Sequence, residues 1–317
     1  MDIVKVFSNE PAPELVRDAQ SIAQIPPVSL PVMDEDSLQA IHEELKVDSA
    51  FQVPFDSIAT FPFSEPLMLE GMDIQLDTLE FDRKYYFLDP QIYPGNCTGK
   101  LIHREGQSSA ALIGPRIILT AAHCVHSGPE GNGLKKGISF QPGFPSHGKW
   151  YTIDQIFIPN DWVVEKKLTA DYAICTLTEP VTNGNYYGIQ VMANDSRGGW
   201  IKLGYPSYPK ELFNGKKLVS DFGRSYWRTG RTLGAENLIG SWDNDMEYGA
   251  SGGPWINKDE YMKGEILTHS RNAKGEFGNY INGVTSHGLK RKPGAVFSPY
   301  FGGKAKVFFQ QVLNTLS

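Results

Sequence analysis

The chain has 317 residues, of which 40% are hydrophobic and 21% charged, a composition typical of a globular protein with a sizeable core. No run of about 18 apolar residues occurs, so the sequence predicts no membrane-spanning helix. Charge is uneven: residues 1–90 hold 18 Asp and Glu against 5 Lys and Arg, and the remainder holds 18 against 25. The basic residues are scattered and no reading helix accompanies them, which argues against nucleic acid as a partner.

Residues 1–90 are predicted to be an acidic leader or pro-segment. Proline-rich residues 9–34 indicate an extended linker, and residues 34–45 indicate a short helix with a capping Asp36 or Ser37. Two interpretations of the leader stay open. It docks on the basic body that follows it, or it is a solvated and partly disordered segment.

From about residue 91, short apolar runs alternate with Gly, Pro, Asn and Asp, a pattern typical of short strands joined by turns. The predicted strands cover residues 110–113, 117–120, 151–158, 172–177, 200–205, 254–257, 264–270 and 281–286. The last segment, residues 304–316, carries a helical stripe of apolar residues. Paired antiparallel barrels or a sandwich closed by one terminal helix are therefore expected.

Three residues in separate segments form a candidate catalytic set. Ser251 lies in "GASGG" and needs a base before its hydroxyl can act as a nucleophile. His123, in "IILTAAHC", follows a strand and two small alanines, which leave room for its ring. Asp171, at the mouth of the strand "YAICTL", is the preferred carboxylate to orient the base, with Asp161 and Asp154 as rivals.

The blocks "LTAAHC", "DYAICTL" and "GASGGPW", spaced 48 and 80 residues apart, resemble the catalytic blocks of the chymotrypsin-like (trypsin-fold) serine peptidases. "LGYP" and "DNDMEYGASGGP" are similar to the glutamyl-endopeptidase-like branch of that group. The resemblance covers residues 91–317. It implies an all-β peptidase domain of two antiparallel six-stranded β-barrels with a C-terminal helix.

The resemblance also implies roles for single residues. Ser251 would be the nucleophile, His123 the general base and Asp171 the residue that orients it. The amides of Gly249 and Ser251 would form the oxyanion hole. The partner implied is a protein or peptide substrate, with no metal and no organic cofactor.

The three cysteines allow at most one disulfide. "CTGKLI" resembles the family block whose cysteine bridges to the one after the catalytic histidine, which implies a Cys97–Cys124 disulfide and a free Cys175. Secretion is expected from the family. No secretory signal is visible at the start of the sequence, and a cytoplasmic location is the alternative.

Specificity is open to two interpretations. Asp245 lies six residues before Ser251, where trypsin-like enzymes place the acid that binds Lys or Arg before the cut bond. "GVTSHG" resembles the strand that pairs with substrate, so Ser286, His287 and Gly288 are expected to line the pocket. His287 could instead favour Glu. Ala250 stands where trypsin-like enzymes have the Asp that binds a freed N-terminus, so activation by removal of the leader, as in a zymogen, would need another contact.

Two other functions fit parts of the sequence. Residues 249–253 match the nucleophile elbow of α/β-hydrolases, Gly-x-Ser-x-Gly, but that fold needs the order Ser, Asp, His. A catalytically silent peptidase homologue that acts as a binding module is the second alternative. All three members of the catalytic set are present, which favours an enzyme.

Overall fold

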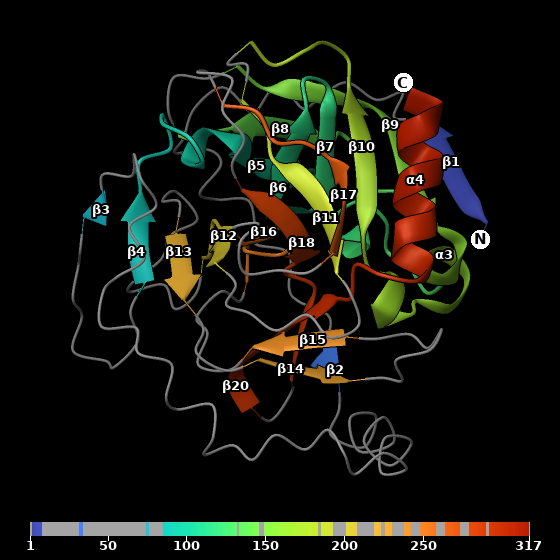
Figure 1. The fold of residues 1–317 in the computed structure, drawn as a ribbon. Coiled ribbons are helices and arrows are strands. Elements are labelled where there is room, and N and C mark those ends of the chain that lie inside the picture. Colours follow the sequence, from blue (N-terminus) through green and yellow to red (C-terminus); the bar gives the residue numbers. More distant parts are fainter. Residues whose placement is uncertain are drawn as a thin grey trace.

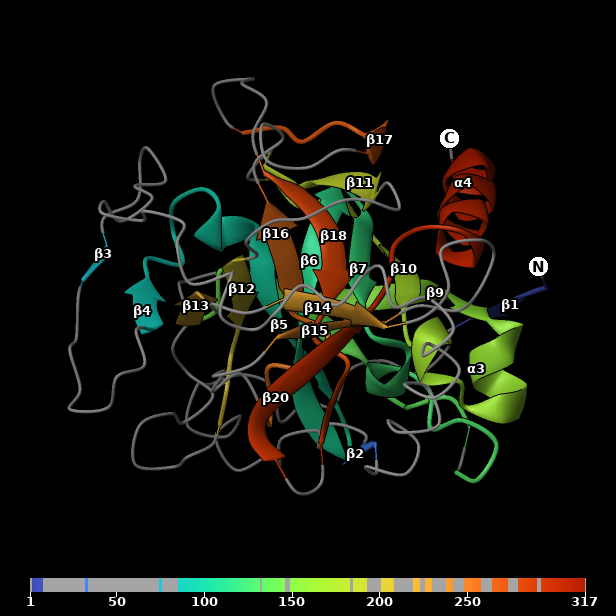
Figure 2. The same ribbon diagram turned by 60° about the horizontal axis from the view of Figure 1, so that its bottom comes forward.

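Figures 1 and 2 show the chain in a computed structural model. The structure describes residues 2–7, 32–33, 74–75, 85–131, 133–145, 149–182, 185–192, 201–207, 219–222, 226–229, 238–241, 248–257, 264–272, 279–289 and 292–316. The helix expected over residues 34–45 lies outside this part of the chain. The described residues are mostly in strands, as the sequence predicts.

The first lobe is a closed barrel of six antiparallel strands. Its order is β9-β10-β7-β6-β5-β8, and β8 pairs back with β9 to close the ring. The strands are β5 (Thr98–His103), β6 (Gly106–Gly114), β7 (Ile117–Thr120), β8 (Ser139–Pro142), β9 (Tyr151–Pro159) and β10 (Ala173–Leu177). Every residue of β5, β6 and β10 is buried, so the sequence shows no hydrophobic–polar alternation along these strands.

The second lobe consists of two further sheets. An eight-stranded sheet has the order β17-β11-β18-β16-β12-β13-β4-β3, and a five-stranded sheet the order β14-β15-β20-β19-β2. Figure 2 shows β14, β15 and β20 of the smaller sheet below β16 and β18 of the larger one. The strands are β2 (Val32–Met33), β3 (Ile74–Gln75), β4 (Tyr85–Leu88), β11 (Gly188–Met192), β12 (Ile201–Gly204), β13 (Val219–Phe222), β14 (Tyr226–Thr229), β15 (Leu238–Ser241), β16 (Pro254–Asn257), β17 (Gly264–Thr268), β18 (Tyr280–Val284), β19 (His287–Leu289) and β20 (Lys292–Pro299).

Two strand pairs in this lobe depart from the expected antiparallel arrangement, because β11 is parallel to β18 and β2 is parallel to β19. Among the described residues, the closed ring of six strands is the first lobe only. Where a second barrel is expected, the described residues form two separate sheets.

Parts of the leader contribute strands to the body. β1 (Ile3–Phe7) extends the barrel sheet by pairing antiparallel with β9 (Figure 1). β2 lies against β19, and β3 and β4 extend the larger sheet of the second lobe. The described parts of the leader are therefore bound to both lobes by strand pairing.

The helices lie on the outside of the barrel. α4 (Lys304–Leu316) has the boundaries that the apolar stripe predicts. It buries Phe308 and Phe309, which contact Tyr172 just before β10 with ring centroids 5.1 and 5.4 Å away. The other helical elements are α3 (Asn160–Glu165) and the 3-10 turns η3 (Gly95–Cys97), η4 (Ala122–Cys124) and η5 (Leu168–Ala170).

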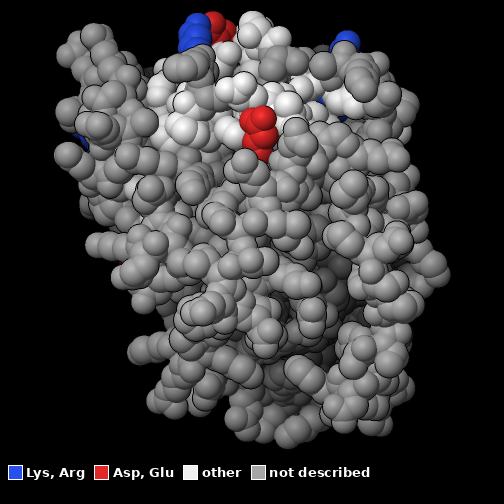
Figure 3. All heavy atoms as spheres, turned by 90° about the vertical axis from the view of Figure 1, so that its left-hand side faces the viewer, with Lys and Arg blue, Asp and Glu red and all other residues white. Residues whose placement is uncertain are grey.

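Two observations concern the surface of the described residues. No described helix is long and apolar enough to cross a membrane. On the face shown in Figure 3, the described charged side chains are of both signs and stand apart near the top of the view. This part of the surface therefore forms no extended patch of one charge.

The expected Cys97–Cys124 disulfide is wrong, since both residues and Cys175 are free and buried. The strand beside β7 is β6, not β5, so "CTGKLI" is not the block that faces the histidine turn. Thr98 lies opposite Ala111, which lies opposite Leu119 on β7. Cys97 is thus level with the middle of β7 and on the far side of β6, whereas Cys124 follows the end of β7.

Candidate active site

His123 and Asp171 meet because their strands are antiparallel neighbours. β7 pairs with β10, and Thr120 at the end of β7 lies opposite Ala173 at the start of β10. His123 follows β7 in η4, and Asp171 precedes β10 directly after η5, so both lie at the same end of the barrel. The sheet register therefore brings together two residues that are 48 positions apart in the sequence.

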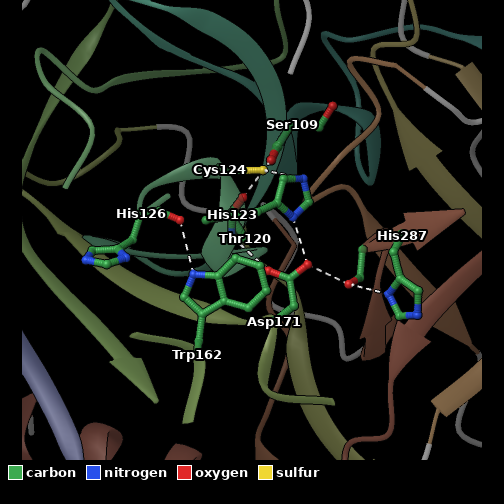
Figure 4. Close-up of polar contacts among 9 residues, drawn as sticks. Ser109, Thr120, His123, Cys124, His126, Trp162, Asp171 and His287 are labelled. Atoms are coloured by element: carbon green, nitrogen blue, oxygen red, sulfur yellow. Dashed lines mark hydrogen bonds and ion pairs between the residues drawn. The ribbon is translucent and has the colours of Figure 1, made fainter. Parts of the chain in front are cut away.

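The Asp171 carboxylate holds the His123 ring and the His123 main chain at once (Figure 4). Oδ2 lies 2.7 Å from His123 Nδ1, and Oδ1 accepts a hydrogen bond of 2.8 Å from the His123 backbone N–H. Asp171 is fully buried and His123 nearly so. The ring of Trp162 from α3 lies 6.4 Å from the His123 ring, and its Nε1 donates to the carbonyl oxygen of His126.

The electrostatics of the two residues are strongly coupled. Burial alone lowers the pKa of His123, but the Asp171 charge and hydrogen bond, with Cys124 also contributing, outweigh burial and raise it. Burial conversely raises the pKa of Asp171, and the charge of His123 together with three hydrogen bonds lowers it below its usual value. The arrangement therefore favours an ionised Asp171 and stabilises a proton on the imidazole.

Ser286 and His287 continue the polar chain beyond Asp171. Ser286 Oγ donates to Asp171 Oδ2 at 2.6 Å and lies 2.8 Å from His287 Nδ1 (Figure 4). The His287 ring is fully buried and stacks on Phe297, with centroids 5.3 Å apart. Burial lowers the pKa of His287 to about 3, although the nearby Asp171 charge opposes this. His287 is therefore neutral at physiological pH.

Ser251 lies in the turn that leads into β16, on the second lobe. Its backbone oxygen accepts a hydrogen bond of 2.8 Å from Ser109 N on β6 of the barrel. Its Oγ is buried and has no hydrogen-bond partner among the described residues. His123 Nε2 contacts Cys124 Sγ at 3.7 Å, and the hydrogen bond expected between His123 and Ser251 is not formed in this structure.

The glycines around Ser251 are required by backbone geometry and by space. Gly249 and Gly252 have φ of 87° and 77°, a region that other residues rarely adopt. A Cβ on Gly252 would lie 2.0 Å from Thr120 Oγ1, and one on Gly253 would lie 2.0 Å from the carbonyl oxygen of Leu203. The turn therefore packs directly on the end of β7, just before the η4 turn that carries His123.

Ser109 is a site residue that the sequence analysis missed. Its Oγ donates to the carbonyl oxygen of Gly249 at 2.9 Å and accepts from the N–H of Tyr205 at 3.0 Å. Its own N–H holds the Ser251 carbonyl oxygen, and its carbonyl oxygen accepts from Thr120 Oγ1 at 2.9 Å. The partners are mostly backbone atoms about a hundred or more residues away, so no local sequence signal could reveal them.

The predicted specificity residues are only partly described. Asp245 lies outside the described residues. Gly288 belongs to β19 and pairs with Val32 of the leader, while Ser286 and His287 turn their side chains toward Asp171. Their role in substrate binding, and the oxyanion role of the Gly249 and Ser251 amides, stay predictions. Within the described ranges, no cluster of three or more His, Cys, Asp or Glu side chains could hold a metal ion.

Comparisons with known proteins identify the family. The family described as Trypsin matches residues 89–295, about two thirds of the chain. A Glu endopeptidase solved in complex with MPD is similar to the chain at 17% identity, covering 74% of this chain and 99% of its own, with a TM-score of 0.54.

Two bacterial proteases give similar overlaps. They are the thermostable serine protease AL20 from an extremophilic microorganism and the protease Anisep from Arthrobacter nicotinovorans, at 23% and 21% identity and TM-scores of 0.49. They cover 69% and 68% of this chain, and 98% and 94% of their own. A search of curated protein sequences found no match.

Proposed function

The chain belongs to the trypsin family and is a serine endopeptidase, and from this premise we propose that Ser251, His123 and Asp171 carry out its reaction. Ser251 Oγ attacks the carbonyl carbon of the peptide bond while His123 Nε2 takes its proton. His123 then gives that proton to the leaving amine as the bond breaks. Water repeats the cycle on the acyl-enzyme, and the amides of Gly249 and Ser251 bind the oxyanion at both stages.

The pairing of His123 with Asp171 is the observation that carries this proposal. A general base at Nε2 needs the ring proton on Nδ1, and an ionised Asp171 2.7 Å from Nδ1 favours that tautomer. The raised pKa of His123 supports the imidazolium that forms when Ser251 gives up its proton. Ser251 reaches the base when its Oγ replaces Cys124 Sγ beside Nε2.

A serine-directed covalent probe tests the proposal most directly. A fluorophosphonate should label the chain once, on Ser251, and Ser251→Ala should abolish the labelling. Ser108→Ala is the matched control, because Ser108 is also a buried serine and its Oγ has no partner among the described residues. Labelling that persists in Ser251→Ala, or a folded chain that neither reacts nor cleaves peptides, would favour the silent homologue.

The leader is proposed to restrain the active site through β2. β19 pairs with β20 along one edge, and its other edge is paired with Val32 and Met33 of the leader. The resemblance implies that substrate adds as a strand beside "GVTSHG", which ends in β19. The leader and the substrate would then compete for one strand edge.

Proline substitutions test this restraint better than deletion does, since deleting residues 1–90 would also remove β1, β3 and β4 from the sheets. Val32→Pro with Met33→Pro removes both backbone donors of β2 in the full chain. We expect kcat/KM to rise roughly 10-fold as the weakened pairing frees the edge of β19 for substrate. Val28→Pro with Ser29→Pro adds the same number of prolines outside β2 and is the control. An unchanged rate would reduce β2 to a tether.

For specificity, we propose a preference for Lys or Arg before the cut bond, read by Asp245. A carboxylate on the pocket floor would pair with a long cation and leave other side chains facing an unmet buried charge. The alternative is a preference for Glu, read by His287. Profiling with a peptide library separates the two: cleavage after Lys or Arg should disappear in Asp245→Ser, whereas cleavage after Glu that disappears in His287→Ala would overturn the proposal.

Two further proposals concern the fold and the compartment. The trypsin fold implies a second barrel, and the two sheets of the second lobe are proposed to form it. Secretion is proposed from the family, with a cytoplasmic location as the alternative. The three free buried thiols support that alternative, because disulfides persist mainly in oxidising compartments. Fractionation of cells that produce the chain natively would distinguish the two.

A further inference from the structure

The hydrogen positions between Asp171 and His287 follow from the chemistry of the groups. An ionised carboxylate only accepts hydrogen bonds, so the 2.6 Å contact between Ser286 Oγ and Asp171 Oδ2 uses the single proton of the Ser286 hydroxyl. The 2.8 Å contact between Ser286 Oγ and His287 Nδ1 must then be donated by the histidine. His287 therefore carries its proton on Nδ1.

The other ring nitrogen of His287 is left without a partner. A neutral imidazole has one proton, so Nε2 is an acceptor, and it is buried with no hydrogen bond among the described residues. An unpaired buried acceptor is unfavourable, and a phenylalanine would stack on Phe297 equally well without it. Packing alone therefore does not account for a histidine here, and the donor at Nδ1 does.

We propose that His287 is a positioning residue that orients the catalytic pair through Ser286. The four residues form a directed chain in which His287 Nδ1–H donates to Ser286 Oγ, Ser286 donates to Asp171 Oδ2, and His123 Nδ1–H donates to the same oxygen. A donor to the Ser286 oxygen polarises its O–H and strengthens the bond to Asp171. The fixed carboxylate in turn fixes the His123 ring. This inference rests on the proposed function of His123 and Asp171.

Two substitutions separate the donor from the ring. His287→Phe keeps the stacked ring and loses the donor, whereas His287→Asn loses the ring and keeps an N–H near the position of Nδ1. We expect His287→Phe to lower kcat roughly 3- to 10-fold with KM unchanged, and His287→Asn to restore kcat to within about 2-fold despite a lower melting temperature. Phe297→Leu is the packing control and should lower stability without lowering kcat.

A double-mutant cycle tests whether the effect passes through Ser286. In a Ser286→Ala background, His287→Phe should cause no further loss of kcat. Independent losses that multiply would overturn the relay. So would a His287→Phe enzyme with unchanged kcat, or a His287→Asn enzyme as slow as His287→Phe.

A spectroscopic measurement tests the same inference without using activity. In the full-length protein with ¹⁵N-labelled histidine, nitrogen–proton correlation spectra should show the His287 ring protonated on Nδ1 only, and its signals are identified as those missing in His287→Phe. The proton between His123 and Asp171 should also shift downfield in His287→Phe, because a weaker Ser286 bond leaves Asp171 Oδ2 a stronger acceptor for His123. Protonation of His287 on Nε2 would overturn the relay even in an active enzyme, whereas failure of the proposed function would appear as an intact relay in a chain that does not cleave peptides.

Discussion

The two lobes contribute to the candidate site in different ways. The first barrel is a closed ring of strands, and it supplies both His123 and Asp171 from the same end of one sheet. Their contacts with each other lie entirely within that lobe. The second lobe supplies Ser251 from a turn, and the hydrogen bonds of this turn run to Ser109 on the barrel and to Thr285 before β19.

The comparison shows that the base and its carboxylate both come from one lobe, with Ser286 of the second lobe as an added donor to Asp171, while the nucleophile itself depends on the contact between the two lobes. Gly252 packs on Thr120 and on the backbone of Ser109, and Ser109 Oγ bridges the Gly249 carbonyl and the Tyr205 amide. Changes within the barrel should therefore affect the protonation of the base. Changes at the junction should affect where Ser251 lies.

Removing the nucleophile or the general base should have the largest effect on activity. Ser251→Ala and His123→Ala should each lower kcat by roughly 10⁴-fold or more, because neither residue can act without the other. The double variant should be no slower than the single variants. Steady-state hydrolysis of a peptide substrate measures this, with circular dichroism to show that each variant is folded. If the double variant lost kcat by the product of the two single losses, Ser251 and His123 would act independently of each other.

Gly252→Ala should separate the lobes and is expected to have the next largest effect. The new Cβ would lie 2.0 Å from Thr120 Oγ1 and 2.4 Å from the Ser109 carbonyl oxygen, which cannot move away without breaking β6. We expect a loss of more than about 3 kcal/mol in the free energy of unfolding.

Gly303→Ala is the matched control for this substitution. Gly303 also has positive φ, 49°, but an added Cβ would meet nothing within 4 Å. It should lose only about 1–2 kcal/mol from backbone strain. Equal losses in urea titrations of the two variants would show that the junction is loosely packed.

Neighbouring serines on β6 give a finer test of the junction. Ser109→Ala leaves the Gly249 carbonyl and the Tyr205 amide without their bridging hydroxyl, at a cost of about 1–3 kcal/mol for each group left unpaired. Because Ser251 is carried by the same turn, kcat/KM should fall roughly 10-fold or more. Ser108→Ala should be neutral or stabilising, since Ser108 Oγ has no partner among the described residues. The same response from both variants would refute the assignment of Ser109 to the junction.

Local sequence patterns predicted the pieces of this site better than their connections. The apolar run 117–120 and the segment 173–177 are strands as expected, and α4 begins and ends where its apolar stripe does. The contact between His123 and Asp171 was predictable because the family blocks carry it. Ser109 was not, because serine in a buried strand has no local signature for partners on the other lobe.

The wrong disulfide shows a different limit. "CTGKLI" fits the family block in composition, yet the register puts β6 beside β7 and leaves Cys97 on the far side. A single sequence contains two adjacent strands that could take this place, and only strand pairing decides between them. The strands of the leader were missed for a related reason, since β1 and β2 gain their hydrogen bonds from partners far along the chain.

The buried histidines predict a modest loss of stability in acid. Burial lowers the pKa of His287 to about 3 and that of His103, on β5, to about 4, from 6.5 in the unfolded chain. The unfolded state therefore binds protons first as the pH falls, so stability is fully present above about pH 6.5 and is lost between there and about pH 3. His123 adds no slope in this window, because its raised pKa affects stability only above pH 6.5. Each histidine contributes at most about 1.4 kcal/mol per pH unit.

Urea midpoints at pH 7 and pH 4.5 should differ less in His287→Phe and in His103→Phe than in the unaltered chain, and least in the double variant. Ser108→Ala, which changes no titratable group, should keep the full difference. An unchanged difference in the double variant would assign the acid sensitivity to groups other than His103 of the first lobe and His287 of the second.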